Sequence, residues 1–99
     1  MMVENQNGAA TRDALLALAD RVQAADRSDN RLDVEVDVAL FVPGAYATIR
    51  ANAAGTKIIC TRPDGLERTY WAFDYTRNAE NRGMAANSLR ARAAMMGEG

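Results

Sequence analysis

The segment Arg-Pro-Asp-Gly at 62–65 restricts the folds open to this chain more than any other. Its proline presets φ at the first corner of a β-turn, its aspartate tolerates the second corner, and its glycine accepts positive φ. The flanking segments 56–61 and 67–75 are rich in β-branched and aromatic residues, which favour strands. The sequence therefore predicts an antiparallel hairpin around this turn.

A third strand is expected at 46–51, joined to the hairpin by the turn residues 52–55, so that the three strands form a meander. In the last strand, alternation places Trp71 and Phe73 on one face and Tyr70 on the other. We expect Trp71 and Phe73 to be buried in the core of the sheet. Tyr70 is then the more exposed ring.

Two helices are predicted from apolar residues that recur at spacings of three and four. Thr11 is the N-cap of the first helix, which is expected to run to about Asp26. The last helix is expected to begin near Asn78. The side chains expected to be buried are Leu15, Leu18, Ala19 and Val22 in the first helix, and Ala86, Leu89, Ala93 and Met96 in the last.

The segment 32–40 supports two interpretations. Its leucines and valines alternate with Asp33, Glu35 and Asp37, which is the period-two pattern of a half-buried strand. The same segment carries a helical stripe, with Asn30 as a candidate N-cap and Asp33 in the first turn. The pattern of residues alone leaves strand and helix both open.

The length of the chain sets the scale of the domain. It has 99 residues, of which 48% are hydrophobic and 25% charged, which is enough for one core. We expect a single domain at 11–96 and a flexible polar tail at 1–10. The longest apolar run, 38–42, is far shorter than the roughly 20 residues that span a bilayer, so no membrane partner is predicted. A domain of this size has little surplus stability, which favours a homo-oligomer or a partner.

Several kinds of chemistry are disfavoured by the composition. The chain has no histidine, which excludes a serine–histidine triad and removes the commonest metal ligand. The single cysteine, Cys60, is expected to be a buried strand residue. With no second cysteine to form an internal disulfide, it suits a reducing cytoplasm. Asp33, Glu35 and Asp37 would form a cation site only on a strand, and a solvated face is the preferred interpretation. We predict no catalytic residue, no metal and no cofactor, and therefore no enzyme.

Aromatic and cationic side chains make up the candidate surface for a ligand or partner. Rings beside cations stack on bases and hold phosphates, and the hairpin register brings Lys57 near Trp71. A sheet core for the rings and a solvated face for the arginines of the last helix are the competing interpretations. With 12 basic and 13 acidic side chains, nucleic acid is an unexpected partner. The candidate surface consists of Lys57, Arg68, Tyr70, Trp71, Arg90 and Arg92.

Five stretches of the chain resemble one group of proteins. They are DALLALADRVQAAD at 13–26, RLDVEVDVAL at 31–40, NAAGTKIICT at 52–61, YWAFDYT at 70–76 and SLRARAA at 88–94. Taken together, they are similar to small uncharacterised proteins encoded by tailed bacteriophages and prophages, mainly of α-proteobacteria. The resemblance implies no activity, cofactor or site residue. It does favour a helix at 32–40, because the related proteins are richer in alanine there.

These expectations combine into one architecture and three functions. The predicted fold is an α+β domain with two N-terminal helices, a three-stranded antiparallel meander and a C-terminal helix packed on the sheet. The phage context of the resemblance, together with the lack of catalytic groups, favours a non-enzymatic phage accessory protein in the host cytoplasm that binds a host factor, with inhibition of a defence or regulatory system as one role to expect. The alternatives are a small nucleotide-binding protein and a virion assembly accessory protein.

Overall fold

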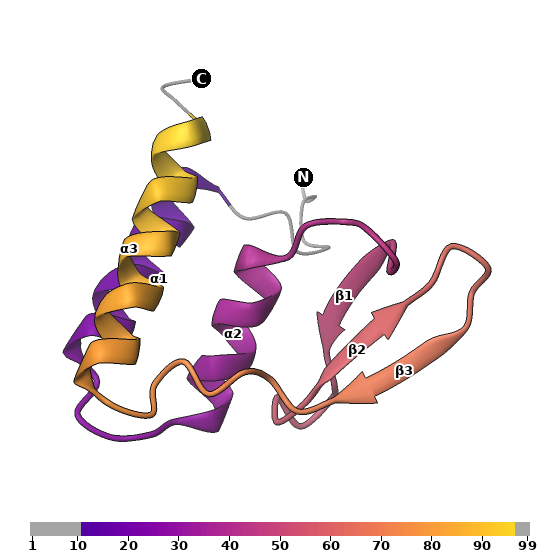
Figure 1. Ribbon diagram of the computed structural model, residues 1–99, viewed down its shortest axis with the longest axis horizontal. Coiled ribbons are helices and arrows are strands. Elements are labelled where there is room, and N and C mark those ends of the chain that lie inside the picture. Colours follow the sequence, from indigo (N-terminus) through magenta and orange to yellow (C-terminus); the bar gives the residue numbers. More distant parts are fainter. Residues whose placement is uncertain (1–10, 97–99) are drawn as a thin grey trace.

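The computed structural model describes residues 11–96, so the predicted tail at 1–10 lies outside the described residues. Three helices and three strands confirm the α+β class (Figure 1). The segment 32–40 is helical. The elements in chain order are α1 (Arg12–Ala24), α2 (Asn30–Leu40), β1 (Thr48–Ala51), β2 (Ile58–Thr61), β3 (Glu67–Tyr70) and α3 (Ala79–Met96).

Side-chain caps define where the helices begin. Thr11 Oγ1 accepts a hydrogen bond from the Ala14 amide at 3.0 Å, which confirms the predicted cap of α1. At α2 the cap is Asp29 and not Asn30, because Asp29 Oδ1 accepts from the Leu32 amide at 3.1 Å. Each cap satisfies one amide that has no partner inside its own helix.

The sheet is the predicted antiparallel meander, in the order β1-β2-β3. At the 62–65 turn, the Gly65 amide donates to the Arg62 carbonyl oxygen at 2.9 Å, and the φ of Gly65 is 93°. A positive φ of this size favours glycine, so the residue type and the turn agree. The hairpin expected from this segment is confirmed.

Helix α2 lies between the sheet and the other two helices (Figure 1). α1 and α3 pack along each other and both contact α2, whereas the contacts of the helices with β1 and β2 come from α2. The C-terminal helix was expected to pack on the sheet. In the structure α3 packs on α1, and the helical layer meets the sheet through α2.

The central position of α2 explains its ambiguous sequence. Residues two apart lie about 200° apart around a helix, whereas residues four apart lie nearly above one another. Alternating apolar residues on a helix therefore form two separate apolar faces. Leu32 and Val36 belong to the core shared with α1 and α3, and Val34 and Val38 pack with the sheet. A pattern that predicts a strand also fits a helix that is covered on both sides.

Two apolar clusters form the interior. The cluster between the sheet and α2 contains Val34, Ile58 and Cys60, which confirms the buried position of Cys60. Met96 was expected in the interior of the last helix but is 44% exposed, because it lies in the final turn beyond the contact with α1. The cluster among the helices contains Leu15, Leu18, Ala19, Val22, Leu32, Val36, Ala85, Ala86, Leu89 and Ala93.

The expected burial of Trp71 and Phe73 was wrong. Strand β3 ends at Tyr70, and the exposed fractions are 66% for Trp71, 63% for Phe73 and 44% for Tyr70. The chain leaves the sheet at this point because it must cross to α3. The Phe73 amide then donates to Asp37 Oδ2 at 3.2 Å, a side-chain partner that takes the place of a neighbouring strand.

Aspartates on one face of α2 hold the crossing segment. The Tyr75 hydroxyl donates to Asp37 Oδ1 at 3.1 Å, and the Thr76 amide and hydroxyl both lie 2.8 Å from Asp33 Oδ1. The Thr76 hydroxyl oxygen also accepts from the Asp29 amide at 2.7 Å. Asp29, Asp33 and Asp37 are four residues apart, about one helical turn, so all three lie along the crossing segment.

Burial raises the pKa of Asp33, while the two hydrogen bonds from Thr76 act in the opposite direction. The Asp33 residue as a whole is only 4% exposed. The folded protein therefore holds the Asp33 proton more tightly than the unfolded chain does. The contribution of this proton to stability is complete below the ordinary aspartate pKa, and it is lost as the pH rises through the raised pKa of the folded state.

The raised pKa of Asp33 leads to a pH-dependent prediction for Asp33→Asn, a variant that keeps an oxygen acceptor for Thr76 but carries no charge. We expect the stability of the wild type to fall relative to that of Asp33→Asn as the pH rises through the interval just above the ordinary aspartate pKa. Urea unfolding of both proteins at a series of pH values measures the difference. A difference that stays constant across that interval would contradict the raised pKa.

Candidate functional site

The predicted pairing of Lys57 with Trp71 is present in the structure. Lys57 Nζ lies over the indole, 4.6 Å from the ring centroid. Continuing the register of Ile58 with Tyr70 by one residue brings Lys57 opposite Trp71. The pair therefore lies on the face of the sheet that points away from α2.

Tyr70 and Arg68 do not join this pair. They stand opposite Ile58 and Cys60, whose side chains face α2. Residues directly opposite each other share a face, so Tyr70 and Arg68 lie on the face of the sheet toward α2. There the Tyr70 hydroxyl lies 2.6 Å from that of Tyr46, with the two rings edge to face. The four residues expected to form one surface are divided between the two faces of the sheet.

The candidate surface includes two arginines of the last helix, and both have partners within the fold. Arg90 Nη2 lies 3.1 Å from Asp20 Oδ1 and joins α3 to α1. Arg92 Nη2 donates to the Phe41 carbonyl oxygen at 2.9 Å, at the C-terminal end of α2, where a cation is favoured. These contacts explain Arg90 and Arg92 without a phosphate ligand.

The exposure of Trp71 leads to a stability prediction. Trp71→Ala is expected to lower the free energy of unfolding by less than about 1 kcal/mol, because the exposed ring contributes mainly its contact with Lys57. A buried tryptophan would cost about 3–5 kcal/mol on truncation to alanine. Urea unfolding followed by far-ultraviolet circular dichroism measures the change. A loss within the second range would show that the ring is part of the core.

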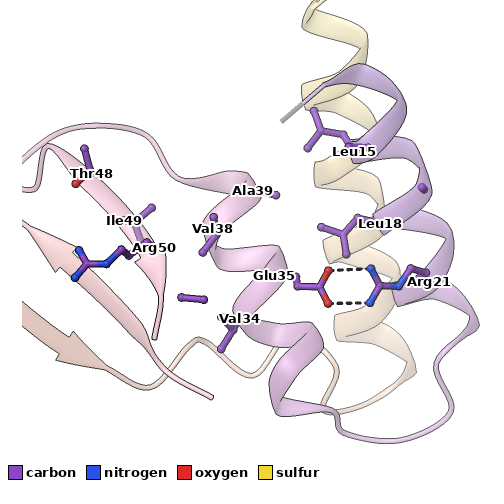
Figure 2. A pocket seen from close by; sticks show the side chains of 13 residues that line it. Leu15, Leu18, Arg21, Val34, Glu35, Val38, Ala39, Thr48, Ile49 and Arg50 are labelled. Carbon is purple, nitrogen blue, oxygen red and sulfur yellow. Dashed lines mark hydrogen bonds and ion pairs between the residues drawn. The ribbon is translucent and has the colours of Figure 1, made fainter. Parts of the chain in front are cut away.

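A groove of about 920 Å³ lies between α1, α2 and β1. In Figure 2, α2 forms the middle of the groove, and β1 and α1 stand on either side of it. Its apolar lining includes Leu18 of α1, Val38 and Ala39 of α2, and Ile49 of β1. The groove exists because α1 and β1 both contact α2 but do not contact each other.

The charged residues of the groove are already paired. Arg21 of α1 and Glu35 of α2 make two hydrogen bonds of 2.8 Å across one end of the groove (Figure 2). The bonds to Glu35 raise the pKa of Arg21. On β1, Arg50 Nη2 lies 3.1 Å from Glu67 Oε2 of β3. Among the described residues that line the groove, no charge is left over for an ionic ligand.

Strand β1 contributes a free backbone edge to the groove. Its partner is β2, and within residues 11–96 no strand pairs with its other side. The Asn52 amide donates to the Lys57 carbonyl oxygen at 3.0 Å. Because backbone groups alternate along an antiparallel strand, the N–H and C=O groups of Ile49 and Ala51 then point away from β2. Two donors and two acceptors therefore border an apolar groove.

This groove was not predicted from the sequence. Segment 46–51 was correctly expected to contain a strand, but its position at the edge of the sheet follows from the strand order. The one available signal was the alternation in 32–40, because a helix with two apolar faces separates its neighbours. Glu35 and Ala39 then fall on the side left between those neighbours, which is the middle of the groove.

The fold and its groove define a small α+β protein with a central helix and an open strand edge. Comparisons with protein-family models, with curated proteins and with solved structures found no match. In the part of the chain that the structure describes, no three histidine, cysteine, aspartate or glutamate side chains gather as a metal site. No helix of residues 11–96 is both long and apolar enough to cross a membrane.

Proposed function

We propose that this chain is a non-enzymatic accessory protein that binds a protein partner in the groove between α1, α2 and β1. The observation that carries the proposal is the apolar groove of about 920 Å³ beside a free strand edge. An apolar surface beside unpaired backbone groups is a typical site for protein association. Its charged residues all have partners within the fold, which favours a protein partner over an ionic metabolite.

The biological setting of the proposal comes from the resemblance to phage and prophage proteins. It supports a partner that belongs to a bacterial host and a role in the host cytoplasm, with inhibition of a defence or regulatory system as the outcome. Recovery of the protein from purified virions would instead support a role in assembly. Recovery from the cytoplasm of infected cells, with particles free of it, would support host-factor binding.

A matched pair of variants tests the groove. Ala17 is an exposed groove residue of α1, and Gln23 is an exposed residue of the same helix on its opposite side. Ala17→Glu and Gln23→Glu add the same charge, but only the first places a carboxylate in the apolar groove. We expect a host protein captured by the wild type and by Gln23→Glu to be lost by Ala17→Glu. Affinities measured with that purified host protein are expected to be similar for the wild type and Gln23→Glu and much weaker for Ala17→Glu.

A capture pattern that is identical for all three proteins would reject the groove as the partner site. Circular dichroism spectra and unfolding curves of the two variants are the control for folding. Both substitutions occupy exposed helical positions, where changes in stability stay within about 0.5 kcal/mol. A difference in capture would then report on binding.

Nucleotide binding is the second candidate function, and the contact of Lys57 with Trp71 favours it. The indole is 66% exposed and carries a cation at 4.6 Å, so a base and a phosphate would both find a contact. A thermal-shift screen tests it, because a nucleotide at 100 times its dissociation constant adds about 2.7 kcal/mol of stability. A shift that is lost in Trp71→Ala would support this function, and a flat screen would reject it.

A further inference from the structure

We propose that the partner enters the groove as an extended segment and pairs with β1 as a fourth strand of the sheet. This inference rests on the proposed function and specifies the conformation and the side-chain pattern of the bound segment. The partner segment carries apolar residues at every second position. The proposal follows from the backbone groups of β1, from the position of the groove and from the charges along it.

The backbone of β1 sets the conformation of the bound segment. The outward N–H and C=O groups of Ile49 and Ala51 need donors and acceptors at the spacing of alternate strand residues. An extended segment provides them, whereas a helix has its own backbone groups bonded internally. The opposite edge of the sheet, β3, has four exposed residues and does not line this groove, so a strand added there would not enter the groove.

The position of the groove sets where the added side chains lie. A fourth strand would lie about 4.8 Å from β1, over the space bounded by α1 and α2. Side chains on its inner face would continue the row made by Ile49 and Ala51 and would meet Leu18 and Val38. Alanine side chains on both helices leave room for them. The residues with small side chains in the lining are Ala14, Ala17, Ala39 and Ala51.

The charges along the groove set the chemistry of those inner side chains. Arg21 is paired with Glu35, and Arg50 with Glu67, so a charged inner residue would lose its hydration and gain no partner. Apolar inner residues have no charge whose hydration would be lost. Polar residues between them would face solvent on the outer side of the sheet, beside Thr48 and Arg50. The expected partner segment therefore alternates apolar and polar residues.

A displayed library of random peptides is the probe for this proposal. It is selected on the wild-type protein and counter-selected on Ala17→Glu, so that retained peptides depend on the groove. Enrichment of peptides with apolar residues at every second position supports the proposal. Enrichment of peptides with helical spacing of three and four overturns it, as does failure to enrich any peptide over the counter-selection.

Two measurements on an enriched peptide examine the strand pairing itself. Ala51→Pro removes an N–H that points away from β2, whereas Ala51→Ser keeps it, and proline is tolerated on an edge strand. The peptide is expected to bind Ala51→Pro about tenfold more weakly, and to lose less affinity for Ala51→Ser, which changes the side chain in the groove but keeps the N–H. In the wild type, the amides of Ile49 and Ala51 are expected to become protected from hydrogen exchange when the peptide binds. This readout stands even if Ala51→Pro fails to fold.

Other occupants of the groove give different results. A peptide that binds while these two amides exchange freely would show that a partner occupies the groove without adding a strand, which overturns this inference and leaves the proposed function intact. Protection of the two amides in the free protein that grows with its concentration, together with a dimeric mass, would show that a second copy covers β1. That result also overturns the proposal.

Discussion

Replacing Leu89 by alanine is expected to lower the free energy of unfolding by about 3 kcal/mol. Leu89 is fully buried in the middle of α3 and belongs to the cluster that joins the three helices. Its neighbours on α3 are small, with Ala85, Ala86 and Ala93 buried on the same face, so that helix has few side-chain atoms with which to fill the vacated space. A cavity that cannot collapse adds its own cost to the lost burial of the side chain.

The measurement is urea unfolding, with Met95→Ala as the matched control. Met95 lies on the same helix but is 87% exposed, so its truncation is expected to change the free energy of unfolding by less than about 0.5 kcal/mol. Domains of this kind have a total stability of about 5–15 kcal/mol, so the Leu89 variant should show a large fall in its urea midpoint. Equal midpoints for both variants would show that α3 does not close the core.

Replacing Asp33 by alanine is expected to lower the free energy of unfolding by about 2 kcal/mol. The substitution removes the oxygen that lies 2.8 Å from both the amide and the hydroxyl of Thr76. Thr76 is fully buried, so water cannot replace the lost acceptor. Leaving these donors buried with no acceptor costs more free energy than is gained by removing a buried carboxylate, because that carboxylate already accepts two hydrogen bonds.

Two controls separate the hydrogen bonds from the charge. Asp33→Asn keeps an oxygen acceptor and is expected to retain most of the stability, whereas Asp26→Ala removes an exposed carboxylate and should have little effect. Urea unfolding at neutral pH compares the three variants. A loss in Asp33→Asn as large as that in Asp33→Ala would attribute the effect to the charge and not to the two hydrogen bonds.

These two predictions concern residues that hold the fold, whereas the residues proposed to bind a partner are exposed. Leu89 joins α3 to the other helices, and Asp33 fixes α2 to the crossing segment before α3. Ala17 and Ala51 lie on the surface of the groove, and their exposed side chains are not part of the core. The chain therefore allows tests of binding and of folding that do not interfere with one another.

The hairpin and the outer helices were predictable because each depends on residues close in sequence. The turn at 62–65 needs only its proline, aspartate and glycine, and α1 needs only its cap at Thr11 and one apolar stripe. The burial of Trp71 was predicted wrongly for a related reason. Alternation states which face of a strand a residue occupies, but it does not state that the strand continues past Tyr70 or that anything covers that face.

The sequence by itself determined the meander, the helices α1 and α3, and the absence of histidine chemistry, since these follow from local turn geometry, periodicity and residue type. Only the tertiary structure decided the place of α2 and the groove beside it. An alternating pattern satisfies a half-buried strand and a helix covered on two sides equally well, so the choice depends on partners distant in sequence. Thr76 supplies hydrogen bonds to Asp33, and the sheet covers Val34, and both require the folded chain.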